Sequence, residues 1–497
     1  MTSEERSANP APHILIIPIP LQGHVNSMFN LAEILCLSGL HVTILLSDYT
    51  HHRLLRHASF DSRFSSYTSF RVATISDGLP DDHPRSGSRV VDIVQSLGEV
   101  GGPQFRRLMV SSDAMSDGGA RPRVSCLIMD GMLSFPIPVA EEMGIPFMYF
   151  PTISACGLWP YFCVQEVIDS GELLFKGKNE DKLTFWKSKE MDLMVTSVPG
   201  MEKILRRRDL PSFFRVEDAN DVVLQSIIEQ SKRTRQAVGL IINTFEDLEG
   251  PILDQIGKHN ANQNPYSIGP LHTHLKELQK AKGMESSHHS SSFWKEDDSC
   301  IAWLDSQPPD SVIYVSFGSV ATLTRDELME FWYALVNSGK KFLWVVRADS
   351  IVGGGIGNEI PVELEEGTKL RGLMVEWAPQ ELVLRHKSVG AFFTHSGWNS
   401  TIESIVIGVP MLCWPYFADQ MVNSRFVSEV WKIGLDVKDS CDRLLIESMV
   451  REVMEVKRDE FLEKARGMAN MANKAICEGG SSHVNLNRLI QFFKSTA

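Results

Sequence analysis

Short apolar runs alternate with helical patterns from the start of the chain. The run 13–19 (HILIIPI) predicts a strand, and a loop and an amphipathic helix that ends at Gly39 follow it. The run 41–46 (HVTILL) then predicts a second strand. A strand, a helix and a strand in this order form a βαβ unit. The pattern therefore predicts a parallel sheet.

A later unit of the same kind places two chemically useful side chains. Strands are predicted at 124–129 and 146–150, with a helix through 139–143 between them. Ligands of parallel sheets bind beyond the carboxyl ends of the strands. His24 follows the first strand of the chain and Asp130 follows the strand 124–129, so the two could form a general base and its orienting carboxylate. A helix-entry histidine and an N-capping aspartate would give the same spacing, and the residues leave both interpretations open.

The second half of the chain repeats the pattern and adds two glycine turns. The predicted strand 312–317 (VIYVSF) ends in Gly318-Ser319, and a helix at 324–338 and a strand at 342–346 follow. The predicted strand 389–393 ends in the turn 395–400 (HSGWNS), which opens another helix. The free amides and the positive dipole of a helix start favour phosphate. We therefore expect the second half to bind a nucleotide and the first half to bind an acceptor.

Composition shifts predict the organisation of the chain. Residues 157–242 read as mainly helical, with 239–242 as the last strand of the first half and 206–208 (RRR) as a solvated basic stretch. The Gly cluster 353–357 is predicted as a loop. The expected parts are a disordered lead-in at 1–12, an acceptor-binding domain at 13–265, a linker or mobile loop at 266–299, a donor-binding domain at 300–475 and a C-terminal helix at 476–497.

Charge and cysteine usage exclude several classes of partner. The chain has 497 residues and a net charge of -13, which argues against nucleic acid and anionic membranes as partners. Its eight cysteines form no CxxC spacing, which favours a reducing, cytoplasmic location. No apolar stretch approaches the ~18 residues of a membrane span, and the polar N-terminus does not resemble a signal peptide.

The absence of several short motifs narrows the chemistry. In neither half of the chain is the first predicted strand followed by GxGxxG, which argues against a nicotinamide-dependent dehydrogenase. There is no GxxxxGK[ST] for a phosphoryl-transfer P-loop and no GxSxG that would make Ser396 a hydrolase nucleophile. No Asp-x-Asp pair follows a strand, so no metal is expected at a pyrophosphate.

The stretch 377–420 carries a specific resemblance. It opens with WAPQ, passes through HSGWNS and Glu403, and closes with Asp419-Gln420. Over its full length it resembles the signature box of the plant family 1 UDP-sugar-dependent glycosyltransferases that act on small secondary metabolites. Further matches are Gly23-His24, Asp130, the IGPL at 268–271, the WLD at 303–305 and the SFGS at 316–319.

The resemblance implies an α/β fold of two Rossmann-like domains that face each other across a cleft (GT-B type), with the last helix returning to the N-terminal domain. It also implies a donor site for UDP-glucose without a separate cofactor. The implied roles are uracil stacking by Trp377 within a box that includes Ala378, ribose binding by Gln380 and Glu403, pyrophosphate binding by His395, Asn399, Ser400 and Ser319, and sugar binding by Asp419 and Gln420 with Trp398 nearby.

The implied reaction is an inverting displacement without a metal. His24 would take the acceptor proton, Asp130 would stabilise the imidazolium, and UDP would leave toward the helix ends. Thr152 matches a family position that touches the transferred sugar or its phosphate. Many members have Pro two or three residues after the histidine, where this chain has Val25-Asn26-Ser27-Met28, and many have Cys at the position of Ser396. These departures affect only the local geometry.

The acceptor is the least constrained part of the prediction. The opening 18–28 (PIPLQGHVNSM) resembles the branch of the family that glucosylates iridoid and other monoterpenoid acids, such as 7-deoxyloganetic acid. A flavonoid or other phenol glucosyltransferase stays open, because loops outside the box choose the acceptor. A non-catalytic nucleotide-sugar-binding protein is a further alternative. The resemblance also implies a monomer.

Overall fold

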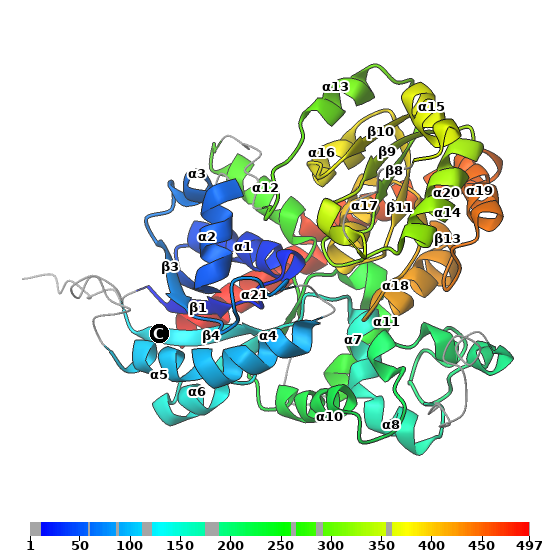
Figure 1. Ribbon diagram of the computed structural model, residues 1–497. Coiled ribbons are helices and arrows are strands. Elements are labelled where there is room, and N and C mark those ends of the chain that lie inside the picture. The colour runs from blue at the N-terminus through cyan, green and yellow to red at the C-terminus, as the bar shows by residue number, and fades with distance from the viewer. Residues whose placement is uncertain are drawn as a thin grey trace, which may run out of the picture.

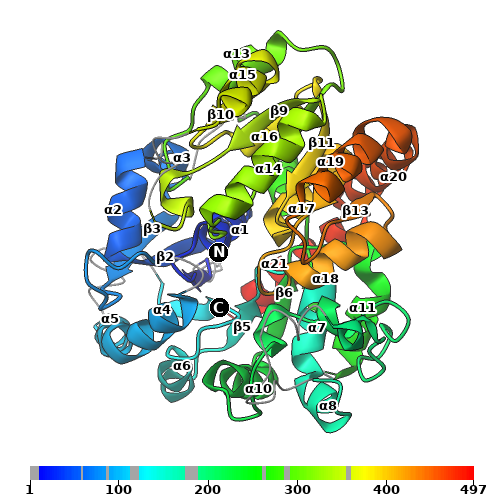
Figure 2. The ribbon, with the colours of Figure 1, turned by 45° about the vertical axis from the view of Figure 1, so that its right-hand side comes forward.

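Two parallel sheets, one in each half of the chain, form two lobes (Figure 1, Figure 2). The computed structural model describes residues 11–57, 60–85, 89–111, 122–173, 188–259, 265–284, 292–353 and 360–496. Helices cover both faces of each sheet, as expected for sheets built from βαβ units. The predicted α/β class with two Rossmann-like domains is confirmed.

The N-terminal sheet has seven parallel strands in the order β3-β2-β1-β4-β5-β6-β7. Its strand order reverses at β1, whose two neighbours are β2 and β4. The strands are β1 (His13–Ile17), β2 (His41–Ser47), β3 (Phe70–Ile75), β4 (Val124–Asp130), β5 (Phe147–Phe150), β6 (Gly239–Ile242) and β7 (Pro265–Ser267). The helices of this half are α1 (Gln22–Leu37), α2 (Asp48–His57), α3 (Phe60–Phe64), α4 (Val90–Ser96), α5 (Gly102–Val110), α6 (Ile137–Met143), α7 (Ala155–Phe162), α8 (Val164–Asp169), α10 (Val222–Thr234), α11 (Glu246–His259) and α12 (Leu271–Ala281).

The C-terminal sheet has six parallel strands in the order β10-β9-β8-β11-β12-β13. Its order reverses between β8 and β11. The strands are β8 (Val312–Ser316), β9 (Lys341–Val345), β10 (Gly372–Val375), β11 (Val389–Thr394), β12 (Met411–Cys413) and β13 (Gly434–Asp436). The helices are α13 (Ser299–Asp305), α14 (Arg325–Asn337), α15 (Val362–Arg371), α16 (Gln380–Arg385), α17 (Trp398–Ile407), α18 (Gln420–Arg425), α19 (Arg443–Arg451), α20 (Arg458–Ile476) and α21 (Ser481–Ser495).

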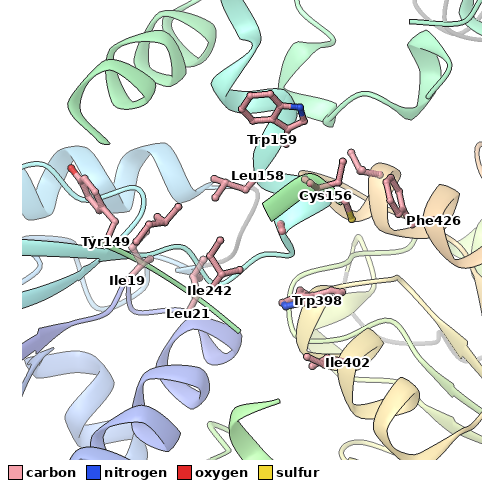
Figure 3. Close-up of a cluster of buried hydrophobic side chains, with 14 of the residues drawn as sticks. Ile19, Leu21, Tyr149, Cys156, Leu158, Trp159, Ile242, Trp398, Ile402 and Phe426 are labelled. Carbon is pink, nitrogen blue, oxygen red and sulfur yellow. The ribbon is translucent and has the colours of Figure 1, made fainter. Parts of the chain in front are cut away.

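Apolar packing continues across the boundary between the lobes. Figure 3 shows Trp398 and Ile402 of α17 opposite Leu21 and Ile242 of the N-terminal half, and all four belong to one buried cluster. The Trp398 indole N–H also donates to the Asn243 carbonyl across this boundary at 2.8 Å. Burial of apolar surface is the main stabilising term in such contacts. The two lobes are therefore held in contact beside the cleft.

The last helix, α21, crosses back to the N-terminal sheet (Figure 1). Leu489 and Phe493 are fully buried in the core cluster of that sheet. At the edge strand β7, the Asn485 amide donates to the Ser267 hydroxyl at 2.9 Å. The C-terminus thus packs on the first half of the molecule.

Two local predictions were wrong, and two others fall largely on residues that the structure does not describe. The segment 271–299 is not only a linker, because its start forms α12, whose Leu271 and Leu275 are buried. The strand 239–242 is not the last of its half, because β7 pairs with it on the far side. The predicted lead-in at 1–12 and the Gly cluster at 353–357 lie largely outside the described residues.

The basic stretch 206–208 was also predicted wrongly, because it belongs to an ion cluster between the lobes. Arg206 pairs with the fully buried Asp209 at 2.8 Å, and Arg208 pairs with Asp439 of the C-terminal half at 3.0 Å. Lys438, which follows β13, pairs with Asp209 at 2.9 Å. A buried charge is stable only when it is paired. The sequence did not indicate this cluster because Lys438 and Asp439, which complete it, are far away in sequence.

Candidate active site

A cavity of about 410 Å³ lies between the two lobes and gathers the predicted site residues from both. His24 and Thr152 line it from the N-terminal half. The C-terminal half contributes the predicted donor residues Ser319, Trp377, Ala378, Gln380, His395, Trp398, Asn399, Ser400, Glu403, Asp419 and Gln420. Asp130 is not among the lining residues, because it lies behind His24 with 1% of its surface exposed.

The His24 and Asp130 side chains meet because β1 and β4 are neighbours in the sheet. Ile17 of β1 is in register with Met129 of β4, so the residues after these positions emerge at the same edge. Asp130 ends β4 and His24 lies in the first turn of α1. The His24 Nδ1 atom is 2.6 Å from Asp130 Oδ2, and 23% of the histidine side chain is exposed.

This contact sets the tautomer of His24. A carboxylate can only accept, so Nδ1–H donates to Asp130 and Nε2 is left with a lone pair. Burial lowers the pKa of His24, but the charge and hydrogen bond of Asp130 and the charge of Asp419 outweigh it, and the net pKa is raised above 6.5. The imidazole is therefore a stronger base than a free histidine.

The Thr152 hydroxyl contacts the same imidazole ring. Its hydroxyl oxygen is 2.8 Å from His24 Nδ1, so it accepts a second, shared hydrogen bond from that N–H. Its own hydroxyl proton remains able to point into the cavity that Thr152 lines. Nothing in the sequence indicated a contact between Thr152 and His24.

The two predicted phosphate turns meet at the ring of His395. A Cβ on Gly318 would lie 2.5 Å from His395 Cε1, and a Cβ on Gly397 would lie 2.4 Å from His395 Nε2. Gly318 also has a positive φ of 73°, which other residues rarely adopt. Only glycine therefore fits on either side of this imidazole. Burial lowers the pKa of His395 to about 4, so the ring is neutral at pH 7.

The start of α17 points its first-turn amides at the cavity. Gly397 is the N-cap, no side chain caps the helix, and its first turn holds no acidic residue. Asn399 and Ser400 of this turn and Ser319 of the facing turn all line the cavity. Free amides, a positive helix dipole and hydroxyl groups form a suitable environment for a pyrophosphate.

The Asn399 side chain has partners in the other lobe. Its Nδ2 donates to the Gly23 carbonyl at 2.7 Å, and its Oδ1 accepts from the Ser27 hydroxyl at 2.8 Å. In this conformation its backbone N–H, and not its side chain, is the group directed to an anion.

An indole ring and hydrogen-bonding side chains lie together in another part of the cavity. Trp377 and Ala378 precede α16, and Gln380 begins it. Gln380 Nε2 donates to Glu403 Oε2 at 2.8 Å and to Ser400 Oγ at 2.9 Å. Burial raises the pKa of Glu403 to about 7, against the lowering effect of Gln380. A carboxylate beside an indole can bind the hydroxyls of a ribose whose base stacks on the ring.

Asp419 and Gln420 lie at the end of the cavity nearest His24. Burial raises the pKa of Asp419 to about 6, while Asn423 donates to its Oδ2 at 2.8 Å. Gln420 Oε1 accepts from the Tyr416 and Phe417 amides at 2.9 and 3.0 Å, which leaves the Gln420 amide nitrogen as the group that can donate to a sugar hydroxyl.

Trp398 differs from the expectation that it lies near the sugar as a binding group. Its side chain is 3% exposed, and its N–H is already bound to Asn243. The ring thus mainly joins the two lobes, as Figure 3 shows.

Asn423 is a site residue that the motif reading missed. Its Nδ2 donates to Asp419 Oδ2 and to the Ser396 carbonyl at 3.0 Å, and its Oδ1 accepts from the Ser154 hydroxyl at 2.6 Å. Ser154 caps α7 in the other lobe. Asn423 is fully buried, four residues after Asp419 on one face of α18. That i, i+4 spacing was the only signal in the sequence.

The comparisons with known proteins agree with this geometry. Residues 291–463 match the family model "UDP-glucoronosyl and UDP-glucosyl transferase". A 7-deoxyloganetic acid glucosyltransferase of Catharanthus roseus is 55% identical over 100% of this chain and 99% of its own length. The myricetin 3-O-rhamnoside 1,2-glucosyltransferase of Crocosmia x crocosmiiflora is 39% identical over 97% of this chain and 96% of its own.

A solved structure has the same fold over nearly the whole length. Phytolacca americana UGT2, complexed with UDP-2fluoro-glucose and pterostilbene, superposes with a TM-score of 0.75 at 27% identity, over 97% of this chain and 100% of that one. The predicted family resemblance is confirmed by these matches. The chain belongs to the UDP-glucoronosyl and UDP-glucosyl transferase family.

Proposed function

We propose that the protein transfers glucose from UDP-glucose to the carboxyl group of an iridoid acid, with 7-deoxyloganetic acid as the first candidate. The observation that carries the reaction is the position of the His24–Asp130 pair, 2.6 Å apart, at the cavity that also receives the start of α17. The acceptor is inferred from the Catharanthus roseus relative, which is 55% identical over the full length.

The donor would lie along the C-terminal wall of the cavity. The uracil stacks on Trp377, the ribose hydroxyls bind Glu403 and Gln380, and the pyrophosphate lies against Ser319, His395 and the first turn of α17. Asp419 and Gln420 bind the sugar hydroxyls beside His24. With the donor bound in this way, the anomeric carbon would lie between the leaving phosphate and the acceptor half.

The chemical step is a displacement at that carbon. An acceptor oxygen forms a bond to C1 of glucose from the face opposite the phosphate, and the C1–O bond to UDP breaks with its electron pair passing to the β-phosphate. The helix amides stabilise the departing charge. A hydroxyl acceptor would lose its proton to His24 Nε2, whereas a carboxylate is already ionised and has no proton to lose.

An acceptor panel tests this proposal. Purified protein would be incubated with UDP-glucose and iridoid acids, phenols or alcohols, and UDP release and product linkage would be measured. We expect a β-glucosyl ester of the iridoid acid as the main product. A phenol glucoside as the main product would favour the second candidate, a flavonoid or other phenol glucosyltransferase. No UDP release with any acceptor would favour the non-catalytic alternative.

We also propose that the protein acts as a monomer in the cytosol. One chain supplies both walls of the cavity, so no second copy is needed to complete the site. All eight cysteines are free and most are buried, which suits a reducing compartment. Among the helices of the described ranges, none has the length and apolar character of a membrane span. Gel filtration and fractionation of the tissue would test these two statements.

A further inference from the structure

Trp294, between α12 and α13, stacks on Trp377, the ring proposed to hold the uracil. The ring centroids are 4.7 Å apart and the planes meet at 26°. Trp377 lines the cavity, whereas Trp294 is not one of the described residues that do so. Trp294 therefore covers one face of the Trp377 ring, and the other face is left for the cavity.

The backbone around Trp294 is fastened to both lobes. The Phe293 N–H donates to Gln22 Oε1 of α1 at 2.6 Å, and the Phe293 carbonyl accepts from Arg53 Nε of α2 at 3.1 Å. On the other side, the Asp297 N–H donates to the Trp377 carbonyl at 3.0 Å. The segment 293–297 thus connects the helix that carries His24 to the start of the donor box.

Two arginines flank the Trp294 ring. The guanidinium carbon of Arg53 lies 4.4 Å from the ring centroid, and that of Arg347, which follows β9, lies 5.2 Å away. Cations over an indole face attract it, and together the contacts restrict its rotamer. Arg347 also donates to the carbonyl of Gly318, the residue before Ser319. Trp294 therefore contacts the arginine that holds the phosphate turn as well as the ring that stacks on the base.

We propose that Trp294 is a positioning residue for the uridine part of the donor: it fixes the Trp377 ring in the orientation that stacks on the base. This inference rests on the proposed function, since it takes Trp377 as the uracil platform. A platform that is already held loses less conformational entropy when the ligand binds. The effect of Trp294 is therefore on affinity for uridine nucleotides and not on the chemical step.

Calorimetric titration with UDP and UMP tests the inference on the full chain. W294L removes the aromatic stack and keeps a buried apolar side chain, and W294F keeps a ring. We expect W294L to bind UDP and UMP more weakly than the wild type, with both dissociation constants raised by the same factor of roughly 3 to 10, as loss of one aromatic pair predicts. W294F should stay within about 2-fold of the wild type. The kcat at saturating UDP-glucose and the acceptor KM should not change in either variant.

Two controls separate positioning from general loss of structure. W303F alters a partly buried tryptophan of α13 that packs on the core of the C-terminal half, and it should bind UDP like the wild type. R53A should reduce the affinity for UDP less than W294L does. The double variant R53A/W294L should bind UDP no more weakly than W294L alone, because Arg53 acts through the Trp294 ring.

Unchanged UDP affinity in W294L would overturn the inference, as would a loss that W303F shares or additive losses in the double variant. A fall in kcat together with a rise in the acceptor KM would overturn it too, because a general structural defect affects both quantities. A wild type that binds no UDP would instead refute the proposed function, so the two failures can be told apart.

Discussion

The Ser27 hydroxyl of α1 donates to Asn399 Oδ1 of α17 across the cleft, at a distance of 2.8 Å. Asn399 returns a bond to the Gly23 carbonyl at 2.7 Å, one residue before His24. These two bonds join α1, which carries the proposed base, to α17, the helix proposed to face the phosphate.

The variant S27A tests the value of this link. Removing the hydroxyl leaves the partly buried Asn399 oxygen short of one donor, so we expect kcat to fall by roughly 3- to 10-fold, the equivalent of one hydrogen bond. UDP affinity, measured by calorimetry, should change little, since the α17 amides are retained. S38A removes a hydroxyl that bonds the Ile34 carbonyl at the far end of the same helix and is the matched control. Equal rates for wild type and S27A would show that the link has no role in turnover.

The variant H24A separates acid acceptors from alcohol acceptors. With an alcohol the base must take a proton, so we expect a loss of roughly 10²- to 10⁴-fold in kcat/KM. With an iridoid acid the oxygen is already ionised, and the loss should stay below about 10-fold.

D130N should follow H24A with each acceptor, since Asp130 acts through the imidazole. The measurement is initial rate of UDP release with both acceptors at one pH. Equally large losses on the two acceptors would contradict a carboxylate mechanism without proton removal.

The pH dependence of kcat/KM should differ in the same way. The neutral imidazole is the active form for an alcohol, and the pKa of His24 is raised above 6.5 by Asp130 and Asp419 in spite of burial. The rate with an alcohol should therefore rise with pH through a value above 6.5. With an acid acceptor, the relevant group is Asp419, whose pKa is about 6, and the rate should fall only as the pH drops through that lower value.

Profiles from pH 5 to 9 with each acceptor would measure the two limbs. The control is the profile of H24A with the acid acceptor, in which the fall in rate at low pH that we attribute to Asp419 should persist. Identical limbs for both acceptors would argue that one group controls both reactions.

The variant N423A tests the support of the sugar end. Asn423 is fully buried and its hydrogen bond is one of the contacts that lower the pKa of Asp419 against the effect of burial. Its loss should raise the pKa of Asp419 further above about 6 and move the acid limb to higher pH. We also expect a higher KM for UDP-glucose, and a loss of roughly 1 to 3 kcal/mol in stability from the partners left unsatisfied. If the rate of N423A falls at the same acid pH as that of the wild type, Asn423 does not act on Asp419.

The variant D209N tests the ion cluster between the lobes. Burial raises the pKa of Asp209, but Lys438 and Arg206 outweigh it and hold the pKa well below its usual value. The stability that this carboxylate contributes is therefore present above about pH 4 and is lost as the pH falls toward the lower, folded pKa.

At pH 7 the loss of this buried partner should cost roughly 3 kcal/mol, seen as a lower melting temperature. D192N is the control, because Asp192 pairs with Arg208 at the exposed surface, where a salt bridge contributes only about 0 to 1 kcal/mol. Equal melting temperatures for D209N and D192N would contradict a stabilising role for Asp209.

Local patterns were sufficient for most of the strands and for the stretch proposed to bind the donor, but they missed others, such as the edge strand β7. The strands at 124–129 and 389–393 were predicted within a residue or two, because apolar runs bounded by glycine depend on neighbours in sequence. The residues from Trp377 to Gln420 lie in one continuous stretch, so their motif was visible before any contact was known. The pairing of His24 with Asp130 could be posed for the same reason, since strand order in a parallel sheet brings the carboxyl ends together.

Contacts between residues far apart in sequence could not be predicted in this way. Ser27 with Asn399, Ser154 with Asn423 and Trp294 with Trp377 each join segments from different lobes or from the connection between them. From their neighbours in sequence alone, these side chains could equally well be exposed to solvent. Their partners depend on how the two sheets pack, because burial and hydrogen-bond geometry are set by the folded surfaces that meet. Sequence therefore fixes which groups can act, and packing between the lobes decides which of them hold one another in place.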